Sequence, residues 1–121
     1  MPTTVPDVVE LVVVNRFRVD ETGADAFRGD VHAALAALAE RPGYEGGHVG
    51  RNVDDPGLWL LTTSWANVGS YRRALSSYDV KVTAVPLLSR AVDEPSAYET
   101  VGDGDAANGP GTNVQVPREL R

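Results

Sequence analysis

The stretch LWLLTTSW, residues 58–65, decides the fold because it reads as a strand with two different faces. Successive residues of a strand point to opposite sides of the sheet. One face carries Trp59, Leu61, Thr63 and Trp65, and the other carries Leu58, Leu60, Thr62 and Ser64. A strand that starts apolar on both faces is typical of the middle of a sheet, so we expect neighbours on both sides.

Three further strands are predicted around this one. Residues 8–19, VVELVVVNRFRV, are rich in β-branched residues, and their LVVV run is again apolar on both faces. Residues 43–53 and 90–101 contain the glycine, proline and charged residues that edge strands tolerate. Pro95 in the last of these marks an edge position or a bulge.

Helices are predicted between these strands. Residues 20–40 place apolar side chains at helical spacing, and shorter helices are expected over 68–77 and 79–88, where Pro86 should end or kink the second. The resulting order, β-α-β-β-α-β, predicts an α+β, ferredoxin-like fold with a four-stranded antiparallel sheet. The first and third strands should lie in the middle and the other two at the edges.

One face of such a sheet is covered by helices, and the other also needs cover. On the uncovered face the first strand places Val12 and Val14 beside Arg16, and the third strand places Leu58 and Leu60 beside polar residues. A half-apolar face of this size suggests a partner sheet. We therefore expect a homodimer formed through the open sheet face.

Composition limits the remaining possibilities. The net charge of −6 argues against a nucleic-acid partner, and the absence of cysteine removes disulfides and thiolate chemistry. No signal peptide or transmembrane span is recognisable, which predicts a cytoplasmic protein without a membrane partner. Residues 1–101 should form the domain, and 102–121, rich in Gly, Asp and Asn, a flexible or partner-packed tail. No His or carboxylate cluster has the spacing of a metal site.

Polar and aromatic residues at the strand ends are candidates for a pocket. Asn15 shares its strand face with Phe17, and Trp65 shares its own with Leu61 and Thr63. If the two strands are neighbours, Asn15 and Trp65 line one cavity. The alternatives are an Asn15 amide bonded to neighbouring backbone and a Trp65 ring that only fills the core.

Two more elements supply candidates for the same cavity. Tyr71 and Leu75, spaced i,i+4 on the next helix, would cover it, with core packing as the alternative for Leu75. His48, in the glycine-rich strand, is a candidate base or hydrogen-bond donor if it faces the cavity. The nearby glycines follow a helix and enter a strand, so they indicate a bulge or close backbone approach and not a nucleotide loop.

Three features occur in order along the chain: NRF after the first apolar run, RPGYEGG after the first helix, and TTSWANVGSYRRAL after LWLL. Together they make residues 8–101 resemble the antibiotic biosynthesis monooxygenase domain, a branch of the dimeric α/β-barrel superfamily. The resemblance implies that the protomers pair into a dimeric α/β barrel. It implies a fold more strongly than a reaction.

The activity that the resemblance implies is oxidation of an electron-rich aromatic, of anthrone, phenol or quinol type, by O2 without metal or flavin. Asn15 would hydrogen-bond to the substrate or to oxygen, and Trp65 would position the ring, with His48 as proton acceptor. The substrate would also contact Phe17, Leu61, Thr63, Tyr71 and Leu75.

Two alternatives stay open. One is a non-catalytic dimeric domain that binds an apolar aromatic ligand. The other is a haem protein, although haem-degrading relatives place a histidine on the helix before the last strand, and residues 76–89 contain none.

Overall fold

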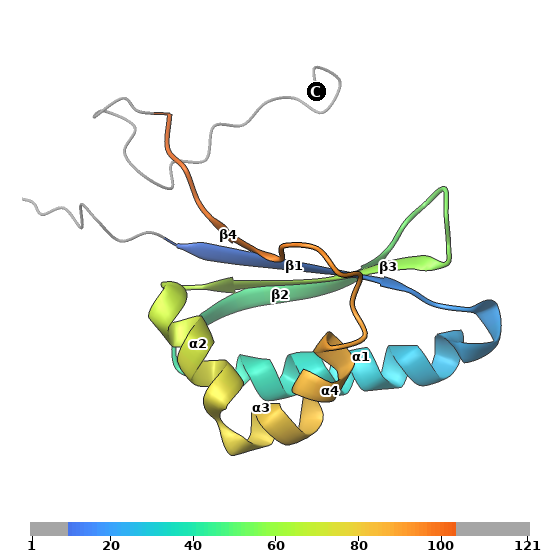
Figure 1. Cartoon of the computed structure of the whole chain (residues 1–121), viewed down its shortest axis with the longest axis horizontal. Coiled ribbons are helices and arrows are strands. Elements are labelled where there is room, and N and C mark those ends of the chain that lie inside the picture. The colour runs from blue at the N-terminus through green and yellow to red at the C-terminus, as the bar shows by residue number, and fades with distance from the viewer. Residues whose placement is uncertain (1–9, 104–121) are drawn as a thin grey trace, which may run out of the picture.

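The computed structural model describes residues 10–103, and Figure 1 shows their helices gathered on one side of a sheet. The strands are β1 (Leu11–Arg18), β2 (Tyr44–Arg51), β3 (Leu58–Trp65) and β4 (Ala97–Glu99). All pairs are antiparallel, in the order β2-β3-β1-β4. The predicted ferredoxin-like α+β fold is confirmed, with the two doubly apolar strands in the middle.

The helical layer contains the short turn η1 (Glu21–Gly23) and four helices: α1 (Ala24–Ala39), α2 (Val68–Ser76), α3 (Tyr78–Thr83) and α4 (Val85–Leu88). The Asn67 side chain caps α2 by accepting a hydrogen bond from the Ser70 N–H at 2.8 Å. The helix expected over 79–88 is divided at Ala84, because Pro86 occupies the first turn of α4. Within residues 10–103 no helix has the length and apolar character needed to cross a membrane.

The core lies between α1–α4 and the covered face of the sheet. Four tiers of paired residues from the central strands form its floor, and three apolar residues of α1, Phe27, Val31 and Leu38, pack onto them with at most 1% of their surface exposed. The tiers are Leu11–Trp65, Val13–Thr63, Asn15–Leu61 and Phe17–Trp59. Because antiparallel partners point the same way, alternation along β1 and β3 fixes which side chains meet.

Strand β2 approaches α1 closely through its glycines. A bulge between Tyr44 and Gly46 shifts the register, which puts Gly47 opposite Thr63 on the covered face. A Cβ at Gly47 would lie 2.8 Å from the Leu35 side chain and 2.8 Å from the Thr62 carbonyl oxygen. The predictions of a bulge and of close backbone approach are therefore both confirmed.

The last strand is much shorter than expected. Instead of residues 90–101, only Ala97–Glu99 form β4, and they pair with the first three residues of β1. Residues 92–96 leave the edge of β1 and return to it, with Pro95 inside the excursion. A proline cannot donate to a ladder, which fits the bulge that Pro95 indicates in the sequence.

The other face of the sheet has no helix over it (Figure 1). It carries Val12, Val14, Leu58 and Leu60, which are half-buried in the single chain. Most of the predicted tail over 102–121 lies outside the described residues. Residues 8 and 9, the start of the first predicted strand, also lie outside them. The boundary predicted at residue 101 therefore stays a prediction.

Candidate active site

Asn15 is the one polar residue that β1 contributes to the covered face, and it is 9% exposed. Leu61 lies directly opposite it, and Phe17 is the next residue along the same face. No residue between 10 and 103 forms a hydrogen bond with the Asn15 side chain. The side-chain amide is therefore free to bind a ligand or water at the pocket that it borders.

A pocket opens beside Asn15 where the chain leaves the edge of β1. The Val14 N–H donates to the Ser96 carbonyl oxygen at 2.7 Å, and the Val92 N–H donates to the Arg16 carbonyl oxygen at 2.7 Å. Between these two bonds, residues 93–95 loop away from the strand at the level of Asn15. The loop leaves a pocket of about 300 Å³ lined by Asn15, Leu88, Ser89, Ala91, Val92, Asp93, Glu94 and Ser96.

An ion pair holds this loop to the sheet. Arg16 reaches Glu94 with two bonds, from Nε to Oε2 at 2.7 Å and from a terminal nitrogen to Oε1 at 2.6 Å. Hydrogen bonds from Arg16, more than its charge, hold the pKa of the Glu94 carboxyl below its ordinary value. A two-bond guanidinium–carboxylate pair fixes orientation as well as distance, so it anchors the loop beside the pocket.

The second group of candidates surrounds Trp65. This side chain has no exposed surface, and its indole N–H donates to the Thr63 hydroxyl at 2.9 Å. The Tyr44 ring meets it edge-on, with centroids 5.5 Å apart, and the Tyr71 ring is tilted against it at 5.6 Å. Burial raises the pKa of the Tyr71 phenol above its ordinary value. Leu75, one turn further along α2, is half-buried against the same core.

Asn15 and Trp65 lie on the same covered face but not side by side. Trp65 is paired with Leu11, and four residues of strand separate Leu11 from Asn15, or about 13 Å. The pocket beside Asn15 is lined by residues of α4 and the following loop, and Trp65 is not among them. The structure therefore brings Asn15, Phe17 and Leu61 together at one end, and Trp65, Thr63 and Tyr71 at the other.

His48 is not on the covered face. Its partner is Thr62, and both side chains belong to the open face of the sheet, where His48 is exposed. In the single chain, the condition under which His48 was a candidate base, that it faces the same cavity as Asn15, is not met. The cause is the bulge near Tyr44, which shifts the alternation along β2 by one residue.

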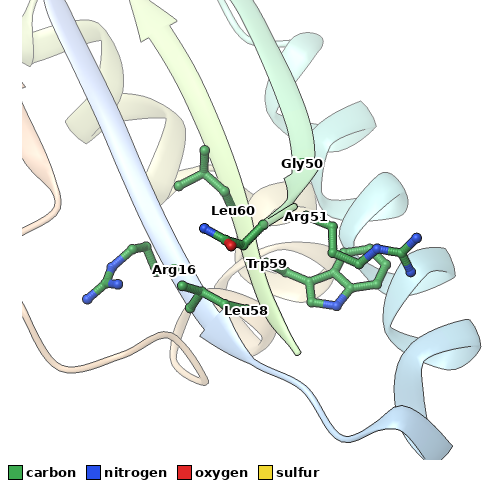
Figure 2. Close-up of a pocket in the computed structure, with 7 residues that line it drawn as sticks. Arg16, Gly50, Arg51, Leu58, Trp59 and Leu60 are labelled. Carbon is green, nitrogen blue, oxygen red and sulfur yellow. The ribbon is translucent and has the colours of Figure 1, made fainter. Parts of the chain in front are cut away.

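A second pocket, of about 290 Å³, lies where the end of β2 meets the start of β3 and is drawn in Figure 2. Figure 2 shows Arg16, Leu58 and Leu60 projecting from the open side, whereas Arg51 and Trp59 project toward α1. The Arg51 guanidinium lies 5.4 Å from the Trp59 ring centroid, a cation–π distance. Arg16 thus borders this pocket while it also holds Glu94 at the Asn15 pocket.

Sequence reasoning missed most of the lining of the Asn15 pocket. The sequence pattern places Ser89, Asp93, Glu94 and Ser96 at a helix end or in a strand, whereas they surround the pocket. The available signal was Pro95, which predicts an interruption at the sheet edge beside the strand that carries Asn15.

A four-stranded antiparallel sheet covered by helices on one face, with an amide beside a pocket that makes no hydrogen bond within residues 10–103, defines a small ferredoxin-like domain with a candidate small-molecule site. The family model for antibiotic biosynthesis monooxygenases matches residues 10–84, more than half of the chain. This protein belongs to that family.

Solved structures with the same fold agree. SnoaB, a cofactor-independent oxygenase from Streptomyces nogalater, superposes with a TM-score of 0.63 at 24% identity, over 74% of this chain and 91% of that one. A conserved protein from Methanosarcina mazei superposes with a TM-score of 0.63 at 19% identity, over 75% of this chain and 92% of that one. Rv0793 from Mycobacterium tuberculosis superposes with a TM-score of 0.61 at 13% identity, over 80% of this chain and 98% of that one. At these identities the likeness establishes the fold alone, and a comparison with curated protein sequences found no match.

Proposed function

We propose that this protein is a cofactor-independent monooxygenase that oxidises an electron-rich aromatic of anthrone, phenol or quinol type at the Asn15 pocket. The observation that carries the proposal is the Asn15 amide, which is 9% exposed and unpaired within residues 10–103 and borders a pocket of about 300 Å³. Membership of the family and the oxygenase named among the structural neighbours support the same reaction class.

The reaction needs no external reductant if the substrate supplies all the electrons. For an anthrone, the ring methylene group and one molecule of O2 give a ketone carbonyl and one molecule of water. The methylene carbon loses four electrons, and O2 gains them. One oxygen atom becomes the carbonyl oxygen and the other leaves as water. The protein has to bind the ring, remove a proton and stabilise the negative charge that collects on oxygen.

Asn15 is suited to the last of these tasks. Its side-chain N–H donors are already oriented by the strand and are not used by another group of the described chain. Leu61 and Phe17, 0% and 1% exposed, flank Asn15 on the covered face and hold its place on the strand. Trp65, Thr63 and Tyr71 act in this proposal as the rigid wall that fixes the strands, with no direct contact to the substrate.

Dimerisation through the open face is the second part of the proposal. The open face presents half-buried apolar surface from Val12, Val14, Leu58 and Leu60. If a second copy packed its own open face against this one, the apolar surface of both sheets would be buried. Light scattering after size-exclusion chromatography measures this directly. A monomer at micromolar concentration would contradict this part and leave the pocket proposal intact.

A non-catalytic domain that binds an apolar aromatic ligand is the alternative function. Trp65 is fully buried and its N–H is already bonded to Thr63, so it is not available to a substrate in this conformation. Oxygen-electrode measurements with dithranol or a quinol separate the two functions. We expect uptake above the buffer rate for the wild type and a loss of about 100- to 1000-fold for Asn15→Ala. Uptake at the buffer rate would favour the binding domain.

A further inference from the structure

Two carboxylates stand next to each other in the loop beside Asn15, and their surroundings differ. Glu94 is held by Arg16 through two short bonds, at 2.7 and 2.6 Å, so its oxygens are occupied. Asp93 is exposed, and within residues 10–103 it has no hydrogen bond or ion pair. Both line the pocket that Asn15 borders.

We propose that Asp93 is the proton acceptor of this site, a catalytic residue that takes the proton from the substrate while Asn15 holds the developing oxyanion. The inference rests on the proposed function, since it names the base for that reaction. Neighbouring carboxylates with different partners take different roles in known acid–base sites. Here Arg16 binds both carboxylate oxygens of Glu94, whereas Asp93 has no partner within residues 10–103.

The charged groups around Asp93 are few. Glu94 follows it in the loop and is neutralised by Arg16 from β1. Arg90, just after α4, lies 3.6 Å from the Asp30 carboxylate on α1. Neither cation forms an ion pair with Asp93, so no side chain of residues 10–103 occupies its carboxylate oxygens.

Other candidate bases are less suitable by position. His48 is on the open face of the sheet, away from the Asn15 pocket. Tyr71 packs against Trp65 at the far end of the covered face. The Ser89 hydroxyl lines the pocket, but it donates its proton to the Pro86 carbonyl oxygen at 2.7 Å, and no hydrogen bond within residues 10–103 joins it to a carboxylate or imidazole.

The step can be written in full for an anthrone. The Asp93 carboxylate accepts a proton from the methylene carbon, and the electron pair of that C–H bond spreads into the ring and its oxygen, which Asn15 stabilises. The carbanion passes electrons to O2, a C–O bond forms, and the resulting peroxide takes back the proton from Asp93. Loss of the second C–H proton and cleavage of the O–O bond then give the carbonyl and water.

The test compares Asp93→Asn with the wild type under the oxygen-electrode assay. A positioned general base contributes about 100- to 10,000-fold, so kcat/KM should fall within that range. Asp54→Asn, an exposed carboxylate in the turn between β2 and β3 that does not line the Asn15 pocket, is the matched control and should keep the wild-type rate. Glu94→Gln should lose less than Asp93→Asn, because it loosens the loop without removing the base.

Chemical rescue distinguishes a base from a structural residue. Formate should restore part of the rate of Asp93→Ala, and substrates with a more acidic proton should be less sensitive to Asp93→Asn. Circular dichroism and a thermal melt verify that each variant is folded. If Asp93 only shaped the loop, formate would not restore the rate and substrate acidity would not alter the effect of Asp93→Asn.

Three outcomes overturn the inference in different ways. If Asp93→Asn stays within about threefold of the wild type while Asn15→Ala is inactive, the function stands and Asp93 is not the base. If Asp93→Ala loses activity but formate gives no rescue and substrate acidity has no effect, Asp93 has a structural role. If the wild type itself consumes no O2, the proposed function fails and the inference falls with it.

Discussion

Replacing Asn15 with leucine should make the protein more stable and, at the same time, inactive. The Asn15 side chain is 9% exposed and has no hydrogen-bond partner within the described chain, so it is partly desolvated without a protein partner. For a fully buried amide the cost of desolvation is about 1–3 kcal/mol, and the remaining exposure puts Asn15 near the lower end, about 1 kcal/mol. The adjoining pocket of about 300 Å³ gives the larger leucine room, so overpacking should be small.

Thermal unfolding followed by circular dichroism measures the effect. For a domain of this size, about 1 kcal/mol corresponds to a rise in Tm of roughly 4–8 °C. Protein concentration must be the same for both proteins, because association raises the apparent stability.

Thr63→Val is the matched comparison, since it is also a polar-to-apolar change on the covered face. The Thr63 hydroxyl accepts the Trp65 N–H at 2.9 Å, and valine would leave that N–H buried and unpaired. Thr63→Val should therefore lower stability by about 1–3 kcal/mol. The reasoning is refuted if Asn15→Leu destabilises by a similar amount, because the amide would then have a partner that it needs.

Three further predictions concern other parts of the fold. Gly47→Ala should lower the free energy of unfolding by denaturant by about 1–3 kcal/mol, because the new Cβ would lie 2.8 Å from the Thr62 carbonyl oxygen. A Cβ at Gly46 would have no atom within 4 Å, so Gly46→Ala is the control. Equal losses in the two variants would contradict this account. Leu60→Glu should convert the proposed dimer to monomer in light scattering, and an unchanged mass would place the interface elsewhere. Arg16 lowers the pKa of Glu94 in the folded state, so the pair stabilises the folded protein at pH values above 4.5, the ordinary pKa of a glutamate. This stabilisation is lost as the pH falls below that value. A difference in Tm between wild type and Glu94→Gln that does not shrink in acid would contradict this linkage.

Much of the fold could be predicted because strand alternation is a local property. The doubly apolar runs around Val13 and Leu61 placed β1 and β3 in the middle of the sheet, and the structure confirms the position. Pro86 predicted a break in the helical segment, and α3 and α4 are separated at Ala84. Each of these features depends on the residue and its immediate neighbours.

The site was harder to predict because it depends on relations between distant segments. Sharing a face is not the same as sharing a cavity: Asn15 and Trp65 point to the same side, yet the Val13–Thr63 tier lies between them. The side of the sheet that His48 faces depends on a single bulge in β2, which inverts the alternation that follows it. The pocket beside Asn15 comes from a loop at residues 92–96, whose path depends on the ion pair between Arg16 and Glu94, 78 residues apart.

The most direct test of the central claim is to follow isotopically labelled O2 into the product. With an anthrone substrate, the wild type should place one labelled atom in the new carbonyl, at a rate above the buffer reaction, and Asn15→Leu should reduce that rate to near background while remaining folded. No labelled product above buffer, or an unchanged rate in Asn15→Leu, would contradict the assignment of the Asn15 pocket as the site of oxygenation.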